Sequence, residues 1–243
     1  MRGFGILPPV VKNLLIINCI FFLATWAVSS SLGIDLSDYL GLHYWESPLF
    51  EIYQIVTYLF MHGDLTHLFF NMFAVWMFGA AIENVWGKKR FLQYYLITGF
   101  GAAFLHYVIV FFQVASLEAI LDPSAINMVL NEGASVLAGH QNYSDPDLGQ
   151  LNYLYHIPIV GASGSLFGLL LAFGMLFPNN EIYIYMLFPL KAKYFVAIYG
   201  AIELFSGFAN TPGDNVAHFA HLGGMLFGYL MIMYWKKTGQ GIY

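Results

Sequence analysis

Residues 160–177 read VGASGSLFGLLLAFGMLF and contain no charged side chain. The two serines of this stretch, Ser163 and Ser165, lie near its beginning. A helix of about 20 mostly apolar residues is long enough to span the hydrocarbon core of a bilayer. Because lipid offers the backbone no hydrogen-bonding partners, such a segment has to satisfy its own N–H and C=O groups, as a helix does. The stretch therefore predicts a membrane-spanning helix that begins with polar groups.

Five further stretches of the chain are apolar enough to span a membrane, and we expect helices near residues 13–30, 65–85, 91–113, 194–208 and 216–235. An apolar segment at 182–190 is interrupted by Pro189, and we expect it to lie in the membrane interface and to lead into the fifth helix. The first apolar run lacks a small-residue cleavage site, so a removable signal peptide is not expected. Residues 1–243 are thus predicted to form a single all-α membrane domain with six transmembrane helices.

The composition excludes an ordinary soluble domain. Hydrophobic residues make up 59% of the chain and charged residues 9%, and the mean hydropathy is +0.65. A soluble domain carries roughly 25% charged residues. The formal net charge of -5 favours neither nucleic-acid binding nor an acidic tail. The single cysteine, Cys19, excludes a disulfide framework and a cysteine zinc site.

The distribution of charge predicts the orientation of the helices, because basic residues gather in the cytoplasmic loops of membrane proteins. With six helices and cytoplasmic N- and C-termini, one side holds all nine Lys and Arg residues, namely Arg2, Lys12, Lys88, Lys89, Arg90, Lys191, Lys193, Lys236 and Lys237. The charged residues of the opposite loops are acidic, such as Asp35, Asp38, Glu46, Glu118, Asp122, Asp145, Asp147 and Asp214. The helix count and the orientation therefore support each other.

Two segments on the predicted outer side are too long to be simple turns. Residues 31–64 are rich in aromatic side chains, which settle at membrane interfaces, and we expect this segment to lie there. Residues 114–159 contain several Asn and Pro residues that indicate turns, and we expect these turns to surround one short helix.

Polar side chains inside spanning helices are costly and are usually functional. Ser163 lies at the start of the fourth predicted helix, where unpaired N–H groups and the helix dipole can stabilise an anion. His221 lies near the start of the sixth helix, and His67 and Asn71 lie near the start of the second. All four are expected at one depth, close to the outer face. We interpret Ser163 as a nucleophile and His221 as its base.

Spaced glycines offer these two residues a way to meet. Gly161, Gly164 and Gly168 follow an i, i+3, i+7 spacing, and His221 with Gly224 and Gly228 repeats it. Small residues let membrane helices approach closely, which would bring the Ser163 hydroxyl within the ~3 Å that activation by a base requires. Gly-x-Ser-Gly alone more often means packing. Its conjunction with His and Asn residues on other helices is what indicates catalysis.

His67 and Asn71 are one helical turn apart, so both could donate hydrogen bonds to an oxyanion together with the Ser163 N–H. We expect His218 to support the site rather than to react. No acidic residue is evident beside His221 in the sequence.

The remaining histidines of this region are less informative. His62 precedes the second helix and could line an entrance or lie in the interface. His106 and His156 are assigned no role.

The sequence resembles the rhomboid intramembrane serine proteases over the whole predicted six-helix core. The family pairs Gly-x-Ser-Gly on the fourth helix with Ala-His and two spaced glycines on the sixth, which are here Gly161, Ser163, Gly164, Ala220, His221, Gly224 and Gly228. Its second-helix pattern is matched by His62, His67, Asn71 and, at the inner end, Glu83. The resemblance implies a Ser163–His221 dyad without an acid, in which His221 is the base and later the acid. It also implies that His67 and Asn71 are oxyanion donors.

Two positions depart from the family pattern. Many members have a Tyr one turn after the nucleophile, where it stacks on the catalytic His, and this chain has Phe167 there. The Trp-Arg pair of the first outer segment appears as Tyr53 and Gln54, which leaves the anchoring of that segment open.

These observations predict an intramembrane serine endopeptidase that needs no metal or other cofactor. The resemblance implies single-pass transmembrane protein substrates, with a helix-destabilising stretch and a small residue before the cut near the outer face. We expect a multi-pass protein of the bacterial cytoplasmic membrane, in contact with lipid, with a site that opens to the extracytoplasmic side.

Two alternatives belong to other functional classes. One is a catalytically silent protein of the same fold that binds or extracts transmembrane helices. The other makes His62, His67, His218 and His221 metal ligands in a transporter or a lipid hydrolase. The metal hypothesis ranks lower because no intramembrane carboxylate is evident near these histidines and because it leaves Ser163 without a role.

Overall fold

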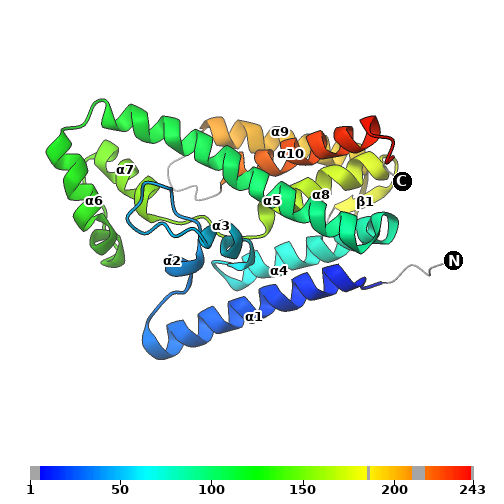
Figure 1. The fold of residues 1–243 in the computed structure, drawn as a ribbon, viewed down its shortest axis with the longest axis horizontal. Helices are drawn as coiled ribbons and strands as arrows, with labels where there is room; N and C mark the ends of the chain where they lie inside the picture. Colours follow the sequence, from blue (N-terminus) through cyan, green and yellow to red (C-terminus); the bar gives the residue numbers. More distant parts are fainter. Residues whose placement is uncertain (1–5, 185–186, 210–216, 242–243) are drawn as a thin grey trace.

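The computed structural model describes residues 6–184, 187–209 and 217–241. Arg2, Asp214 and the expected first residue of the last helix, Val216, lie outside these ranges. The described chain is all-α apart from one small hairpin (Figure 1).

The main helices coincide with the six apolar stretches that the sequence predicts. In chain order they are α1 (Pro9–Leu32), α4 (Leu65–Ala74), the π-helical turn η2 (Val75–Gly79), α5 (Ala80–Glu118), α8 (Ser163–Leu176), α9 (Ala192–Ala209) and α10 (His218–Lys237). Among the described residues, two stretches are long and apolar enough to cross a membrane by length and composition, namely Pro9–Leu32 and Leu65–Glu118. The second is bent at Gly87, whose φ of 75° and ψ of 168° are not helical. This bend separates the predicted second and third helices.

A buried carboxylate joins the first helix to the bend. Glu83 is 3% exposed and accepts hydrogen bonds from the N–H groups of Val10 and Val11, at 3.0 and 2.8 Å. The first N–H groups of a helix have no intrahelical partner, and they form the positive end of the helix dipole. Glu83 therefore caps α1 and holds it against α5.

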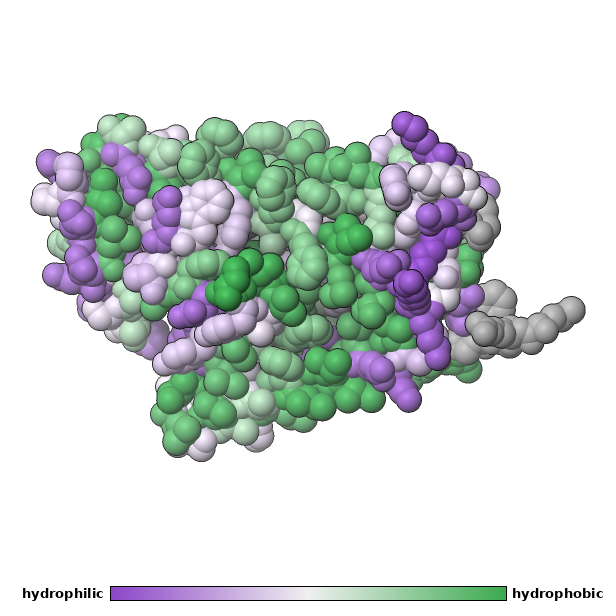
Figure 2. All heavy atoms as spheres, in the orientation of Figure 1, coloured by the Kyte–Doolittle hydropathy of each residue, from purple (hydrophilic) through white to green (hydrophobic). Residues whose placement is uncertain are grey.

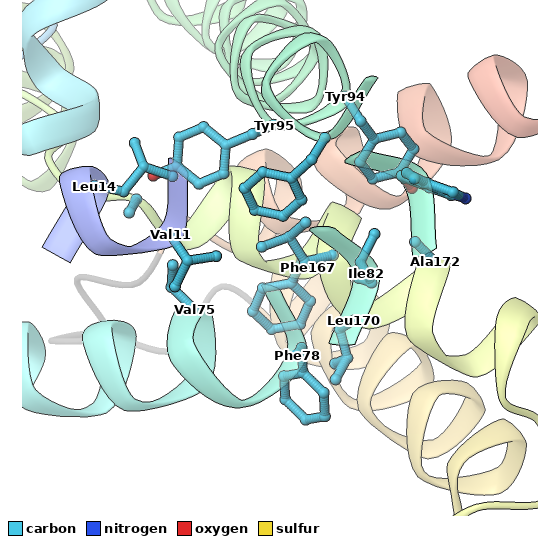
Figure 3. Packing of buried hydrophobic residues seen from close by; sticks show 14 of the residues in the cluster. Val11, Leu14, Val75, Phe78, Ile82, Tyr94, Tyr95, Phe167, Leu170 and Ala172 are labelled. Carbon is cyan, nitrogen blue, oxygen red and sulfur yellow. The ribbon is translucent and has the colours of Figure 1, made fainter. Parts of the chain in front are cut away.

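The core lies where α1, η2, α5 and α8 meet. Figure 3 shows aromatic and branched side chains from these elements in contact, among them Val11, Val75, Phe78, Tyr95 and Leu170. In lipid, such packing and the hydrogen bonds between helices, rather than exclusion of water, hold helices together. One such bond runs from the Tyr94 hydroxyl of α5 to the Gly168 carbonyl of α8, at 2.9 Å.

Helices α8 and α10 approach each other backbone to backbone. A Cβ added at Gly224 would overlap with the carbonyl group of Gly164, so only glycine fits at this contact. Ser163 immediately precedes Gly164, and His221 lies one turn before Gly224. The glycine contact therefore sets the two side chains opposite each other.

The second outer segment differs from the expectation of one short helix, which is wrong. It forms α6 (Pro123–Ala138) and α7 (Pro146–His156). Each helix begins with Pro at its first position, preceded by an Asp, and the Asp145 side chain accepts the N–H groups of Asp147 and Leu148. These Asp-Pro pairs are helix-start signals rather than only turns. The two helices share an apolar cluster with the C-terminal end of α5 and with the first outer segment, formed by Tyr44, Val110, Val114, Leu117, Val129, Leu151 and Tyr155.

The remaining connections contain short elements of their own. The first outer segment contains α2 (Ser37–Leu40), α3 (Gln54–Thr57) and the 3-10 turn η1 (Tyr58–Phe60). The segment interrupted by Pro189 forms an antiparallel hairpin of β1 (Glu181–Ile184) and β2 (Phe188–Lys191), with Glu181 opposite Lys191. The hairpin leads directly into α9, and its location at the membrane interface stays a prediction.

The surface is divided into zones along the long axis of the molecule. Figure 2 shows a broad hydrophobic band between two hydrophilic ends, one formed by α6 and α7 and the other near the end of α10. At the latter end the Arg90 guanidinium lies 4.0 Å from the centre of the Trp235 ring and donates a hydrogen bond to the Gly241 carbonyl. A hydrophobic band of this kind is the surface expected of a membrane protein.

We expect Gly224→Ala to lower the free energy of unfolding by about 2 kcal/mol, because the new methyl group forces α10 away from α8. Thermal unfolding in detergent measures this change. Gly63→Ala is the matched control, since a Cβ at Gly63 meets no atom within 4 Å. Equal midpoints for the two variants would contradict the close helix contact.

Candidate active site

Ser163 is the first residue of α8, and the backbone before it is shaped by a glycine. Gly161 has a φ of 121°, which L side chains rarely adopt, and its N–H donates to the Tyr58 carbonyl at 2.9 Å. A Cβ at Gly161 would also lie 3.0 Å from two ring atoms of His67. The turn thus needs glycine, and it directs the beginning of α8 toward His67.

The Ser163 hydroxyl is hydrogen-bonded to His221 of α10. The distance between Ser163 Oγ and His221 Nε2 is 2.9 Å. His221 is 8% exposed, whereas Ser163 is only partly buried. The pair is therefore held on one side by the packed helices, and the hydroxyl remains reachable from the other.

The ring of Phe167 covers one face of the His221 imidazole. The ring centres are 4.2 Å apart and the planes differ by 9°, so the rings are stacked. Phe167 lies one turn after Ser163 on α8. The position at which many rhomboids have a Tyr therefore keeps the stacking contact in this chain without a hydroxyl.

A carboxylate lies beside His221, so the expectation that no acid is present there is wrong. Oε2 of Glu203, on α9, is 2.9 Å from Nδ1 of His221 and 2.7 Å from Nδ1 of His218. Glu203 is 8% exposed. It lies 18 residues before His221, and only the packing of α9 against α10 brings the two together.

The sequence contains a signal that could have found Glu203. It is the only charged residue between 194 and 208, the expected fifth helix. An ionisable residue within a spanning helix is by itself a reason to suspect a functional site with a partner on another helix. No sequence motif links Glu203 to His218 or His221, so these histidines could not be identified as its partners from the sequence.

Of the two expected oxyanion donors, His67 lies beside the beginning of α8, whereas Asn71 is hydrogen-bonded within its own helix. The His67 ring lies against Gly161, two residues before Ser163, and it packs on His62 with ring centres 4.9 Å apart. The Asn71 amide donates to the His67 carbonyl of its own helix at 3.1 Å. Within the described part of the chain, Asn71 makes no hydrogen bond to Ser163 or His221. His67 is thus close to the beginning of α8, and Asn71 lies one turn deeper.

The first outer segment is anchored by Gln54, which occupies part of the position of the family's Trp-Arg pair. Gln54 is 1% exposed, and its amide donates to the carbonyls of Tyr39 and Leu49 and accepts the N–H of His43. One buried side chain thus satisfies three backbone groups of an irregular loop.

The two outer segments are also joined to each other. Leu42 and Ile159 exchange backbone hydrogen bonds at 2.9 and 3.0 Å. This bridge lies two residues before Gly161 and therefore helps to fix the entry into α8.

The metal hypothesis changes in one respect. Glu203, His218 and His221 offer donor atoms within 4.8 Å of one another, a set that could hold a metal ion. The statement that no carboxylate lies near these histidines is therefore wrong. His62 and His67, the other two proposed ligands, do not belong to this group.

The arrangement has the parts that acyl transfer requires. A hydroxyl, an imidazole and a carboxylate lie in line from α8 through α10 to α9, each 2.9 Å from the next. The first N–H groups of α8 have no intrahelical partner and lie next to Ser163, where they can bind a developing oxyanion.

Comparisons with known proteins point to one family. A family model described as a Rhomboid domain matches residues 49–237. Rhomboid protein 1, mitochondrial, of Saccharomyces cerevisiae is 25% identical over 185 residues, which cover 76% of this chain and 42% of the relative. RHOMBOID-like protein 6, mitochondrial, of Arabidopsis thaliana is 29% identical over 182 residues, or 74% and 43% of the two chains. Rhomboid protease GluP of Bacillus subtilis is 34% identical over 58 residues, or 24% and 11%. The chain thus spans less than half the length of each of these three relatives.

We expect a fluorophosphonate probe to label Ser163 in the folded protein and to lose about 10²–10⁴-fold in rate in His221→Ala, because the hydroxyl then lacks its base. Mass spectrometry of the labelled peptide measures the modification. Ser165→Ala is the control that keeps its labelling, since the Ser165 hydroxyl is buried and donates to the Tyr95 carbonyl at 2.8 Å. Labelling that persists in His221→Ala would contradict the pairing.

A second prediction concerns His62, which precedes α4. Burial, and secondarily the charge of His67, lowers the pKa of His62 to about 4. The unfolded chain therefore binds the proton more readily, and stability falls as the pH decreases from about 6.5 to about 4. We expect His62→Gln to remove about 3 kcal/mol of this acid sensitivity. Unfolding free energies measured between pH 7 and pH 4 test the difference.

The exposed Gln141 provides the control, and Gln141→Asn, which removes no titratable group, is expected to keep the wild-type pH slope. If His62→Gln and wild type lost stability equally on acidification, the burial argument for His62 would be wrong.

Proposed function

The chain belongs to the rhomboid family, whose model matches residues 49–237, and on this premise we propose that it is an intramembrane serine endopeptidase. The observation that carries the proposal is the 2.9 Å hydrogen bond between Ser163 Oγ and His221 Nε2 at the beginning of α8. In this proposal Ser163 is the nucleophile and His221 the general base.

The reaction uses His221 twice. His221 Nε2 takes the Ser163 proton as Oγ forms a bond to the scissile carbonyl carbon, and the carbonyl π electrons move to its oxygen. The tetrahedral intermediate then collapses, the C–N bond breaks, and His221 returns the proton to the leaving amine. A water molecule then attacks the acyl carbon while the same nitrogen takes its proton, the bond between Ser163 Oγ and that carbon breaks, and His221 returns the proton to Oγ. The polypeptide is thereby cut by hydrolysis with no other reagent.

The oxyanion is stabilised mainly by groups at the beginning of α8. The Ser163 N–H lies at the positive end of the helix, and the His67 ring lies beside Gly161. The Asn71 amide nitrogen uses one of its two N–H groups on the His67 carbonyl, so one remains for the oxyanion. Asn71 lies one turn further along α4 from Ser163 than His67 does, so its proposed share is smaller than that of the Ser163 N–H and His67.

The proposed setting is a bilayer crossed six times, with both termini in the cytoplasm. The hydrophobic band of Figure 2 supports a membrane location. In support of the orientation, the Lys88–Arg90 turn meets the end of α10 through the contacts of Arg90, whereas the acidic helices α6 and α7 lie at the other end (Figure 1). Ser163 is at the end of α8 that follows α7. Water would reach it from that side.

The relatives bear on which cellular membrane holds this protein. The relatives from yeast and Arabidopsis are mitochondrial by name, and GluP is bacterial. Because several relatives, those from yeast and Arabidopsis among them, are mitochondrial by name, the comparisons do not support a specifically bacterial membrane, and that assignment stays a prediction.

We propose that the substrates are single-pass transmembrane proteins. Family membership supports this proposal, and so does the only partly buried Ser163, whose hydroxyl an unwound stretch of a substrate helix could meet. The bonded Ser163–His221 pair favours this enzyme over a silent protein that binds helices, which would need neither residue.

We expect Ser163→Ala and His221→Ala to lower cleavage of a tagged single-pass reporter by at least about 10³-fold, because each removes a group that takes part in bond formation. Asn71→Ala should lower cleavage by only about 10-fold. Cleavage in liposomes followed by mass spectrometry of the products measures the rate and locates the cut. Ser165→Ala is the control with retained cleavage, and full activity in Ser163→Ala would overturn the proposed function.

A further inference from the structure

Glu203 is a buried carboxylate that the dyad mechanism does not use. It lies on α9, is 8% exposed and directs one oxygen, Oε2, at two imidazoles of α10. Burying a carboxylate without donors is costly, and a spanning helix is the least favourable place for one. The two imidazole nitrogens that contact Glu203 therefore stabilise the buried carboxylate.

We propose that Glu203 is the positioning residue of His221, so that the site works as a Ser163–His221–Glu203 array in which His218 holds the carboxylate in place. This inference rests on the proposed endopeptidase function. It adds a third participant, on a third helix, to the pair expected from the sequence.

The contact with Glu203 determines the tautomer of His221. A neutral imidazole carries one proton, on either Nδ1 or Nε2. Only a proton on Nδ1 leaves the Nε2 lone pair free to accept the Ser163 proton. Glu203 Oε2 accepts a hydrogen bond at 2.9 Å and can do so only if Nδ1 carries that proton. The carboxylate thus selects the tautomer that acts as a base.

The same contact matters again when His221 becomes charged. The imidazolium formed during attack has N–H groups on both sides, one facing Ser163 and one facing Glu203. A negative carboxylate at 2.9 Å stabilises that cation more than it stabilises the neutral ring, and the effect is strong where water is scarce. The stabilisation therefore acts on the transition state rather than on substrate binding.

His218 supplies the second donor. Its Nδ1 is 2.7 Å from the same Oε2, and its ring lies nearly perpendicular to that of His221, at 88°. The carboxylate is therefore held from two directions on α10. The stacked Phe167 ring limits rotation of the His221 plane from a third side. Together these contacts restrict His221 to the orientation that faces Ser163.

Other titratable groups that face His221 are few in the described chain. Ser163 lies on Nε2, Glu203 on Nδ1, and His218 and His67 are the neighbouring histidines. Among these, Glu203 is the only negative group, so no other described residue substitutes for it.

The test is steady-state kinetics of Glu203→Gln on a transmembrane reporter in detergent. Loss of the carboxylate that orients the histidine of a serine-protease triad lowers kcat by about 10⁴. We expect a fall in kcat of about 10²–10⁴-fold with KM changed by less than about threefold, and a parallel fall in the rate of fluorophosphonate labelling of Ser163. Glu181→Gln is the matched control, because Glu181 is an exposed glutamate of the hairpin, and its kcat should equal that of wild type.

Two further variants test whether Glu203 orients His221 or only holds α9 against α10. Glu203→Met removes the charge and keeps a long side chain suited to lipid, so it decides the question if Glu203→Gln fails to fold. We expect a folded Glu203→Met protein with the same loss of kcat. Glu203→Asp keeps the carboxylate and is expected to recover kcat at least about tenfold over Glu203→Gln.

Wild-type kcat in folded Glu203→Gln or Glu203→Met would overturn the inference and leave the proposed function intact, whereas an active Ser163→Ala protein would overturn the function itself. One zinc ion per chain in the purified protein, with activity lost on its removal, would also overturn the inference. The three donor atoms would then be metal ligands rather than a hydrogen-bonded set.

Discussion

The contact between Gly164 of α8 and Gly224 of α10 is the constraint on which the rest of the site depends. A Cβ at Gly224 has no room, so the two backbones are in direct contact at this point. Ser163 and His221 lie next to this contact, and their side chains span the small gap that remains. A wider spacing would leave the hydroxyl beyond the reach of the imidazole.

Two buried glutamates show how this fold accommodates carboxylates inside an apolar body. Glu83 receives two backbone N–H groups at the beginning of α1, and Glu203 receives two imidazole N–H groups from α10. In both cases two hydrogen-bond donors offset part of the loss of water. The partners differ in kind, however. Backbone donors make Glu83 a structural cap, whereas imidazole donors connect Glu203 to a group that can exchange protons.

The outer segments form a scaffold for the entry into α8. Gln54 satisfies three backbone groups of the first segment, and Leu42 pairs with Ile159 of the second. The chain then reaches Gly161, whose N–H is bonded to Tyr58. Backbone groups that are turned away from water need partners within the protein, so these internal bonds help to keep the turn before Ser163 in place.

The sequence by itself determined the six main apolar helices, the small-residue stripes and the identity of the Ser163–His221 pair, because hydropathy and glycine spacing are local and are readable within one helix. It also placed His67 near the site. Only the tertiary structure decided that Glu203 lies beside His221, that Asn71 bonds to its own helix and that Gln54 anchors the loop. The reason is physical: each of these depends on the rotation and depth of one element relative to another, or on a choice among nearby donors. Neither the relative placement of two elements nor the choice among donors produces a periodic pattern in the sequence.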